Sequence, residues 1–489
     1  MPPMKKALGW AAIATLATVL LAALALAVAL RPPAPPVSAS REFVLPGVTV
    51  VNPGRERRQA VDLAVSDARI AAISSRLTGE RLDRYAGAFV LPGLIDLHTH
   101  LPPDNALGLI PHSALLYLAH GVTSIRESGD LDGTSVEAAR RGMRDGDFPG
   151  PRLFACGPFV GGASSRWSNT WVVSGPEAAA AAVKHVQEAG FDCLKIYDGI
   201  DAETVRALVR EATLAGLPAV GHVPGGVGYE EVLLPDTLHL LGVPPPGTQD
   251  PNSLLSRKSD WDGVDDARIR EIVQLAAEED LANTPTLVVS QQLLHYEDYE
   301  AARRDPAVRM LPRFYRDVVW SPAEGIRLYR GIDAARLTRA RDALEKKLRI
   351  VGQLYRAGAR LRLGTDVGQP FVAPGISLQQ EMALFVAAGV PVEEVWAMAT
   401  RRAGRALGMP RLGSLEPGAP ADLLIFRQDP TRDLAALDSL EAVVADGRLY
   451  TREALAAGQT RWQEHFDGAI LDSLSVLLTR RLIAGLESR

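Results

Sequence analysis

Two histidines separated by one residue give the clearest chemical signal in the sequence. His98 and His100 flank Thr99 at the end of the apolar run LPGLIDLHTH. Residues two apart in a strand point to the same face, about 6.6 Å apart along the backbone, so both imidazoles can bind one ion. Neutral imidazole suits Zn, Fe, Co, Ni or Mn. The pair therefore predicts a metal site without selecting the metal.

Two more histidines and an aspartate end other short apolar runs. His222 closes PAVGHV, His239 closes DTLHLL and Asp366 ends LRLGTDVG. Singly, either histidine could be a core residue satisfied by backbone hydrogen bonds. Together they would mark the carboxyl ends of barrel strands, where enzymes of that architecture place their catalytic groups. An aspartate at such a position can ligate a metal and accept a proton.

A lysine lies inside the apolar run FDCLKIYDG. Cys193, Lys195 and Tyr197 share one face of the predicted strand, and Lys195 stands between Leu194 and Ile196. Burying a lysine as a cation is costly, and a neutral or chemically modified lysine would remove that cost. A salt-bridged lysine at the mouth of the barrel is the alternative interpretation.

The elements that must position these residues follow a repeated pattern. Eight short apolar runs alternate with helical segments, which is typical of a (β/α)8 barrel. The runs are GLIDLH, GVTSIRE, RLFACG, DCLKIY, PAVGHV, DTLHLL, TPTLVV and LRLGTD. An open doubly wound sheet would also alternate, but no Gly-rich nucleotide turn follows the first run. We therefore predict an α/β fold with a (β/α)8 TIM barrel over residues 93–412.

Segments on both sides of the barrel complete the predicted organisation. Residues 41–92 and 413–450 contain short β-type runs, which predict a small split β-sandwich domain formed by both chain ends. Residues 451–489 are predicted to be a helical tail. Its apolar residues recur at helix-face spacing and are expected to pack on the body. These residues are Ile470, Leu471, Leu474, Leu477 and Leu478. The charged, helical insertion over residues 290–360 is either an elaborated crossover or a substrate lid.

The first forty residues differ in composition from the rest. Residues 7–30 carry no charge, follow Lys5 and Lys6, and precede a Pro-rich linker. That apolar length exceeds the core of a cleaved signal and predicts a transmembrane signal anchor over residues 1–40, with a cleaved export signal as the alternative. The positive charges place the short end in the cytoplasm. The catalytic domain is then exported and membrane-anchored, in the periplasm if the source is bacterial, or secreted after cleavage.

Composition excludes several classes of partner and ligand. The 489 residues are 47% hydrophobic, which excludes global disorder, and carry a formal net charge of −5. No long basic run is present, so nucleic acid is not expected as a partner. Cys156 and Cys193 can form one bridge at most and make no Cys-x-x-Cys pair. A metal site must therefore use histidines and carboxylates.

Several of these motifs together resemble the metal-dependent amidohydrolase superfamily, from about Phe43 to Tyr450. PGLIDLHTH, GVTSIR, the lysine in DCLKIY and the closing GSLEPGAPADLLIF are similar to its Xaa-Pro dipeptidase-like and imidazolonepropionase-like group. The resemblance implies two divalent ions, with zinc expected and Mn, Fe or Co as alternatives, bridged by a carbamate on Lys195. One ion would take His98, His100, Lys195 and Asp366, and the other would take Lys195, His222 and His239. The resemblance also implies a bridging hydroxide as nucleophile, with Asp366 passing its proton to the leaving nitrogen.

Two departures from the usual family pattern bear on the substrate. Tyr197-Asp198-Gly199 follows the lysine where many relatives have a Gly-Gly turn, and Glu127-Ser128-Gly129-Asp130 replaces the more usual Asp-rich turn. The hydroxyl of Tyr197 could contact a substrate carbonyl, or the ring could serve packing alone. Arg126 could bind a substrate carboxylate, or form an ion pair in the barrel wall.

The resemblance leads to one principal expectation for function. We expect a membrane-tethered binuclear amidohydrolase that acts on a small-molecule substrate such as a dipeptide or an N-acyl amino acid. A mononuclear, imidazolonepropionase-like cyclic-amide hydrolase with an unmodified Lys195 is one alternative. A lactone or phosphotriester hydrolase and a non-catalytic membrane-anchored binding domain are two more. A homo-oligomer is also left open.

Overall fold

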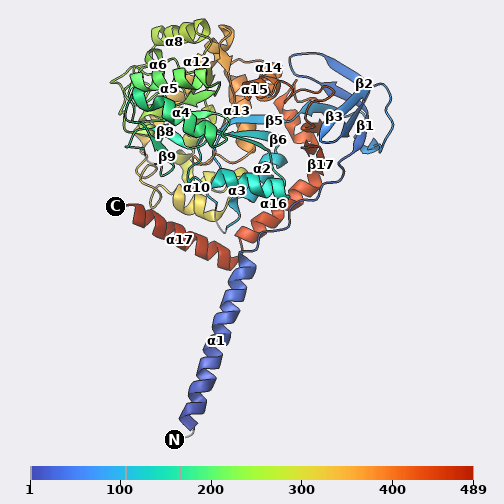
Figure 1. The fold of residues 1–489 in the computed structure, drawn as a ribbon, viewed down its shortest axis with the longest axis vertical. Helices are drawn as coiled ribbons and strands as arrows, with labels where there is room; N and C mark the ends of the chain where they lie inside the picture. Colours follow the sequence, from blue (N-terminus) through green and yellow to red (C-terminus); the bar gives the residue numbers. More distant parts are fainter. Residues whose placement is uncertain (1–2, 105–106, 166, 488–489) are drawn as a thin grey trace.

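Strands from both ends of the chain meet in one sheet. The computed structural model describes residues 3–104, 107–165 and 167–487 (Figure 1). The sheet runs in the order β17-β16-β15-β4-β1-β2-β3. Its strands are β1 (Phe43–Val51), β2 (Arg57–Ser66), β3 (Arg69–Ser74), β4 (Phe89–Pro92), β15 (Leu423–Phe426), β16 (Leu440–Ala445) and β17 (Arg448–Thr451). Because β4 pairs with both β1 and β15, these strands form a single hydrogen-bonded sheet. Its folding into the predicted sandwich stays a prediction.

Two parallel sheets occupy the middle of the chain. One has the order β5-β6-β7 and the other β14-β13-β12-β11-β10-β8-β9, and every neighbouring pair is parallel. The strands are β5 (Leu94–Thr99), β6 (Val122–Glu127), β7 (Arg152–Ala155), β8 (Phe159–Gly161), β9 (Thr170–Val172), β10 (Leu194–Ile196), β11 (Ala219–Gly221), β12 (Asp236–Leu238), β13 (Ala282–Thr284) and β14 (Arg360–Leu361). The predicted α/β class is confirmed.

Backbone hydrogen bonds join these two sheets on both sides. The amide of Leu97 in β5 donates to the carbonyl of Leu363, just after β14, at 3.0 Å. On the other side, the amide of Asp192 donates to the carbonyl of Ala155 in β7 at 2.7 Å. The carboxyl end of β5 therefore lies directly beside the segment that follows β14.

Helices cover these strands and start at recognisable caps. Asp201, Asp265 and Asp333 each accept a backbone N–H with their side chains at the start of α5, α8 and α12. The helices are α1 (Pro3–Ala29), α2 (Leu109–Ala119), α3 (Ser135–Asp145), α4 (Ala179–Glu188), α5 (Ala202–Leu214), α6 (Tyr229–Val232), α7 (Leu254–Ser259), α8 (Asp266–Glu278), α9 (Leu287–Leu293), α10 (Tyr299–Ala302), α11 (Pro306–Arg309), α12 (Ala334–Arg356), α13 (Ile376–Ala387), α14 (Val392–Ala397), α15 (Ala403–Ala406), α16 (Arg452–Phe466) and α17 (Ala469–Glu487). Short 3₁₀ turns span Asp83–Tyr85, Pro176–Ala178, Leu294–Asp298 and Leu434–Ser439, and π-helical turns span Tyr315–Val319 and Met398–Arg402.

The seventh predicted strand is partly a helix. Strand β13 ends at Thr284, whereas the LVV of the run TPTLVV opens helix α9. Pro285 follows the strand and has no N–H to continue its ladder. The carboxylate of Glu381 then accepts hydrogen bonds from the amides of Leu287 and Val288, at 3.0 and 2.7 Å. This buried cap favours a helix start at the place where the apolar run alone predicts a strand.

The helical tail packs by a different face from the one predicted. Leu471, Val476 and Ile483 of α17 are buried against the body, whereas Ile470 and Leu477 are about half exposed. The apolar residues thus surround more of the helix than one stripe. Spacing alone could not decide which side meets the body.

Helix α1 extends away from the body (Figure 1). No helix among the described residues combines the length and the apolar character needed to cross a membrane, so the predicted transmembrane helix is not confirmed. The side chains of residues 1–12 and 22, which include part of the predicted span, lie outside the described residues.

The two cysteines form a disulfide beneath the lysine strand. Cys156 follows β7 and Cys193 precedes β10, and both are buried. The sequence allowed one bridge at most, and the structure contains it. The bond ties the end of the three-stranded sheet to the strand that carries Lys195.

Removal of this disulfide should destabilise the fold. The bridge closes a loop with a sequence separation of 37 residues. Loop-closure entropy for such a length gives a loss of about 3–4 kcal/mol in the free energy of unfolding for the C156A/C193A double variant. Urea unfolding of the oxidised, reduced and double-variant proteins measures it. Equal midpoints for all three would contradict the expectation.

Candidate metal centre

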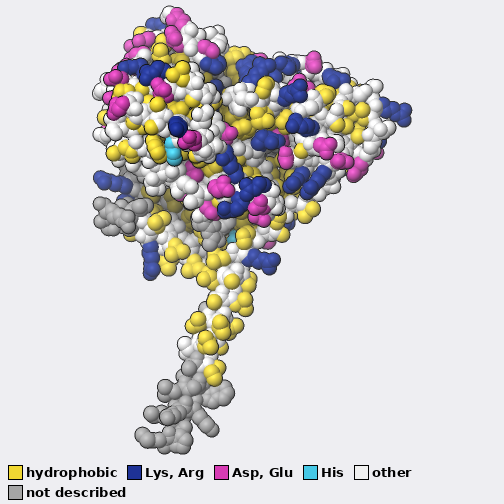
Figure 2. All heavy atoms as spheres, in the orientation of Figure 1, with side chains coloured by type: hydrophobic (Ala, Val, Ile, Leu, Met, Phe, Trp, Pro, Cys, Tyr) yellow, Lys and Arg dark blue, Asp and Glu magenta, His cyan; other side chains and the backbone are white. Residues whose placement is uncertain are grey.

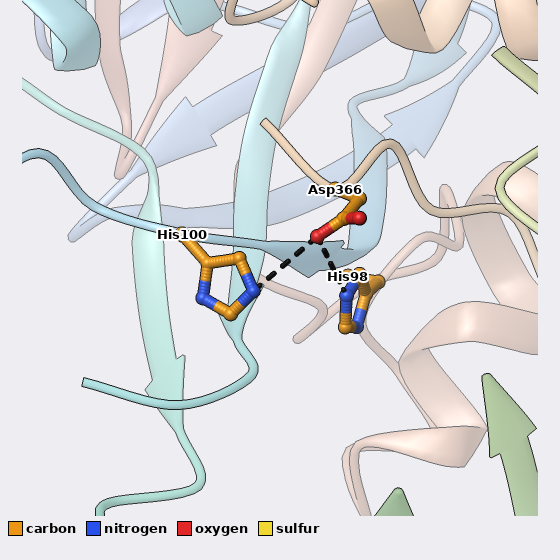
Figure 3. A group of neighbouring side chains, drawn as sticks. All are labelled: His98, His100 and Asp366. Carbon is orange, nitrogen blue, oxygen red and sulfur yellow. Dashed lines mark hydrogen bonds and ion pairs between the residues drawn. The ribbon is translucent and has the colours of Figure 1, made fainter. Parts of the chain in front are cut away.

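His98, His100 and Asp366 form a compact group of potential metal ligands (Figure 3). The two histidines come from the end of β5, and Asp366 lies in the segment after β14. Their Nε2 atoms both approach Oδ1 of Asp366, at 3.2 Å for His98 and 3.4 Å for His100. The ligand atoms of the three residues all lie within 4.8 Å of one another. Three donors at this spacing could surround one divalent ion.

The backbone around Asp366 explains why these residues meet. The amides of Thr365 and Asp366 both donate to the carbonyl of His98, at 2.9 and 2.7 Å. A Cβ at Gly364 would come within 2.5 Å of the Cβ of His98, so only glycine permits this approach. Asp366 itself adopts φ = +58°, a left-handed conformation that is uncommon outside glycine. Such a backbone is maintained only where its surroundings fix it, as at functional sites.

His239 and His222 lie beside this group, in a row of neighbouring rings. The ring centroid of His239 is 4.8 Å from that of His98 and 5.1 Å from that of His222. The Nε2 atom of His239 is 3.8 Å from Oδ2 of Asp366. Like Asp366, His239 has a left-handed backbone, with φ = +60°. The ends of β5, β11 and β12 bring four imidazoles to one place, and the segment after β14 adds the carboxylate of Asp366.

Lys195 lies within β10 and is 1% exposed. Burial lowers the pKa of its amine to about 7, helped by the charges of Arg126 and Lys258, while Asp366 acts in the opposite direction. A substantial fraction of this lysine is therefore uncharged at neutral pH. The sequence predicted that burying Lys195 as a cation would be costly. Partial loss of its charge reduces that cost.

Most of the imidazoles are neutral in this environment. Burial, together with the charge of Lys195, lowers the pKa of His98 and lowers that of His222 to about 3. Burial also lowers the pKa of His239, and the charge of Lys258 adds to this effect. Neutral imidazole is the form that ligates a metal. The Nδ1 atom of His98 is buried without a hydrogen-bond partner among the described residues, which fits a side chain that needs a further ligand.

His100 differs because two carboxylates face it. Burial lowers its pKa, but hydrogen bonds to Asp366 and Glu127 outweigh burial and raise it to about 9. The Nδ1–H group of His100 is 3.1 Å from Oε1 of Glu127 and 3.1 Å from the carbonyl of Gly129. These contacts fix the ring so that Nε2 faces Asp366. A divalent cation at Nε2 would take the place of the second proton.

Several positioning residues were missed by sequence reasoning. Glu127 orients His100, Asp198 accepts from Nδ1 of His222 at 3.4 Å, and Thr286 hydrogen-bonds to Nδ1 of His239 at 2.6 Å. Partners of this kind orient metal-binding histidines in many proteins. For two of them the sequence carried a signal, which was their position at the end of a predicted strand: Glu127 ends β6, and Asp198 follows the strand that carries Lys195.

Lys258 is a further missed residue. It comes from α7, and its Nζ lies 2.7 Å from Oδ2 of Asp366. Burial raises the pKa of the Asp366 carboxyl, but the charges of Lys258 and His239 outweigh burial and lower it well below its usual range. Asp366 is therefore ionised at neutral pH. No sequence pattern linked this short helix to the eighth strand.

Tyr197 lies at the same site, next to the imidazole of His222. Its ring centroid is 4.6 Å from that of His222 and 4.7 Å from that of Phe159, and the residue is buried. The ring therefore forms part of the wall beside the histidines. This location is compatible with both interpretations of the sequence, so a contact of its hydroxyl with substrate stays a prediction.

Arg126 takes part in a buried ion-pair network below the histidines. Its Nη2 is 2.8 Å from Oδ2 of Asp236, and Nη1 of Arg362 is 2.6 Å from the same oxygen. Burial raises the pKa of the Asp236 carboxyl, but the two arginines outweigh burial and lower it. This ion pair accounts for the burial of Arg126, as the second sequence interpretation proposed. Its binding of a substrate carboxylate stays a prediction.

Loss of the central carboxylate should weaken the fold strongly. In Asp236→Asn, Arg126 and Arg362 lose their shared anionic partner in the interior. Breaking a buried pair from one side costs about 3–5 kcal/mol of unfolding free energy. As a matched control, Glu188→Gln removes the exposed Lys184–Glu188 pair and should cost less than about 0.5 kcal/mol. Denaturant unfolding compares the two, and equal losses would refute the role of this network.

Comparison with known proteins agrees with this site. The family model described as "Amidohydrolase family" matches residues 89–232 and 317–450, so the chain belongs to the amidohydrolase family. No match was found among curated proteins. The family's members are hydrolases that act on C–N bonds, and they generally use divalent metals.

Comparison with solved structures shows more specific similarities. A bottromycin amidohydrolase is 28% identical, with a TM-score of 0.67, and the match covers 87% of this chain and 91% of the other. A candidate prolidase from Bifidobacterium longum is 25% identical, with a TM-score of 0.61 and coverage of 87% and 100%. An Xaa-Pro dipeptidase with bound methionine is 20% identical, with a TM-score of 0.59 and coverage of 84% and 100%. The predicted superfamily and its Xaa-Pro dipeptidase-like group are confirmed.

Proposed function

We propose that this protein is a metal-dependent amidohydrolase that cleaves the amide bond of a small substrate such as a dipeptide or an N-acyl amino acid. The observation that carries the proposal is the convergence of buried imidazoles on the carboxylate of Asp366. Purely structural histidines have no need to meet around one ionised carboxylate. The donor set suits a divalent cation, with zinc expected and Mn, Fe or Co as alternatives.

The arrangement of the strands supports a barrel as the scaffold. The two parallel sheets are joined by hydrogen bonds from β5 to the segment after β14, and from the residue before Cys193 to β7. We propose that they form one closed (β/α)8 barrel with the histidines at its carboxyl-terminal face. That face carries the active site in enzymes of this architecture.

Two ions are proposed, with Lys195 between them. His98, His100, Lys195 and Asp366 would hold one ion, and Lys195, His222 and His239 the other. The lowered pKa of Lys195 supports its conversion to a carbamate, because the uncharged amine is the form that adds carbon dioxide. When bound, the ions would supply a hydroxide nucleophile near neutral pH and polarise the substrate carbonyl.

Asp366 is the proposed proton acceptor. Because Lys258 and His239 lower its pKa, its carboxylate is free of a proton at neutral pH. It would take the proton of the attacking water and return it to the leaving nitrogen. The hydrogen bonds that His100 donates to Glu127 and that His222 donates to Asp198 keep the imidazoles turned toward the reacting centre.

A mononuclear enzyme is the second candidate. One observation favours it: among the described residues, the compact group consists of His98, His100 and Asp366, while His222 is a neighbour of the His239 ring. In a mononuclear cyclic-amide hydrolase, Lys195 would stay an unmodified amine. The number of ions per chain distinguishes the two candidates.

Metal analysis of Lys195→Ala tests the binuclear proposal. The purified chain should hold two ions, lose activity on chelation and regain it on reloading with Zn or Mn. Lys195→Ala should hold fewer ions and lose at least about a hundredfold in kcat/KM on the best amide, because it lacks the bridging ligand. Lys184→Ala, an exposed lysine, is the matched control.

Three outcomes of that experiment have different meanings. One ion per chain with activity insensitive to Lys195→Ala would overturn the binuclear proposal in favour of the mononuclear one. A metal-loaded chain that hydrolyses lactones or phosphotriesters and no amide would overturn the amide substrate. A chain that binds metal but hydrolyses none of these substrates would favour the alternative of a non-catalytic binding domain.

We also propose that the protein is exported and anchored at a membrane by its N-terminal segment. The buried disulfide supports an oxidising compartment, because such bonds are rare in the cytosol. Fractionation of a bacterial host that expresses the full chain tests this. We expect the protein in the membrane fraction, with its body cleaved by protease added to the periplasm. A soluble, protease-protected chain would contradict it.

A further inference from the structure

An apolar cavity opens directly beside the candidate metal centre. It begins at His100 and at Val367, the residue after Asp366. Its walls include the following apolar side chains: Leu101, Leu109, Leu131, Leu311, Trp320 and Val372. All of these except Leu131 are buried in the fold. A group bonded to a reacting carbonyl or nitrogen at the centre could therefore extend into this space.

The insertion between β13 and β14 supplies one side of the cavity. Leu311, Tyr315 and Trp320 all come from this insertion, which is helical in the structure. Tyr315 has its pKa raised to about 12 by burial, so its hydroxyl is neutral. The insertion thus serves as a wall of the cavity next to the site.

Beyond His100 at its mouth, the described lining of the cavity carries no charge. It includes no Asp, Glu, Lys or Arg. Burial lowers the pKa of the lining residue His112 to about 3, so its ring is neutral as well. A charged group placed in the cavity away from His100 would lose its hydration and gain no ion pair from these residues.

Two polar atoms in the lining residues lack a partner. Oγ of Ser113 and Nε1 of Trp320 are buried, and neither has a hydrogen-bond partner among the described residues. Buried polar atoms are nearly always satisfied, by protein, water or ligand.

We propose that this cavity binds a bulky, uncharged apolar group attached directly to the scissile amide. The substrate class is then amides that carry a group of leucine or phenylalanine size beside the cleaved bond, with charged groups disfavoured. The inference rests on the proposed amidohydrolase function and adds its specificity. Burial of such a side chain contributes enough to change kcat/KM by about tenfold to a hundredfold.

Two series of dipeptides test the proposal with the metal-loaded full chain. In one series the acyl residue before proline is Gly, Leu, Phe, Asp or Lys, and in the other the amine-side residue after glycine varies in the same way. In at least one series, kcat/KM for Leu or Phe should exceed that for Gly, Asp and Lys by tenfold or more. A flat profile in both series, or a preference for charged residues, would overturn the inference while amide hydrolysis itself stands.

Leu131→Asp connects the preference to this cavity. Leu131 is a half-buried lining residue, so the change adds a carboxylate at the wall without opening the core. The ratio of kcat/KM for the Leu or Phe substrate to that for the Gly substrate should fall at least fivefold. Leu214→Asp, at a leucine that is 77% exposed and distant in sequence, is the control and should leave the ratio unchanged. An unchanged ratio in a folded Leu131→Asp variant would refute the assignment.

If the chain cleaves no amide, the two proposals can still be tested separately. The proposed function would then fail, and the cavity is tested by calorimetric binding of N-acetyl-phenylalanine amide. Binding that weakens at least fivefold in Leu131→Asp, but not in Leu214→Asp, would support the cavity as an apolar binding site. Absence of binding to the wild-type chain would overturn it.

Discussion

An ionised carboxylate buried among imidazoles is the interaction on which the candidate site depends. Asp366 is 2% exposed, and an unpaired charge at that depth would cost several kcal/mol. Lys258 balances its charge at Oδ2, which Nε2 of His239 also approaches, and His98 and His100 approach its other oxygen. The fold must therefore bring β5, the end of β12, helix α7 and the segment after β14 to a single point. The parallel strands and the segments that follow them bring these residues together.

The imidazoles are positioned by a second layer of polar groups, which extends the electrostatic balance outward. Asp198 holds His222 and is itself held by Arg257, whose Nη1 lies 2.6 Å from its Oδ1. The charges of His222 and Arg257 outweigh burial and lower the pKa of Asp198. His100, His222 and His239 each have Nδ1 engaged with an outer partner, which leaves Nε2 for the candidate site. This division would fix the tautomer that a cation requires.

The sequence alone predicted the site better than it predicted the surrounding elements. Period-two spacing paired His98 with His100, and the ends of apolar runs indicated His222, His239 and Asp366, because strand ends are short-range features. Lys258 was beyond reach, since its contact with Asp366 joins residues 108 apart and depends on a helix of six residues. The run TPTLVV was predicted to be a strand from its apolar length alone. That length does not reveal the helix cap that Glu381 supplies from another helix. The sequence left open whether Cys156 and Cys193 pair, because their contact depends on how the end of β7 lies beside the start of β10.

The candidate metal ligands and the apolar cavity lie on separate parts of the chain. The candidate ligands come from strands or strand ends, where neighbouring hydrogen bonds fix their backbone, as at His98 and Asp366. The apolar cavity is lined by segments outside the strands, among them residues 311–320 of the insertion. A change in that insertion can reshape the cavity without moving the backbone that carries the ligands. A scaffold of this kind can retain one reaction while the substrate group beside the cleaved bond changes. An elaborate insertion next to a compact candidate metal centre fits this division.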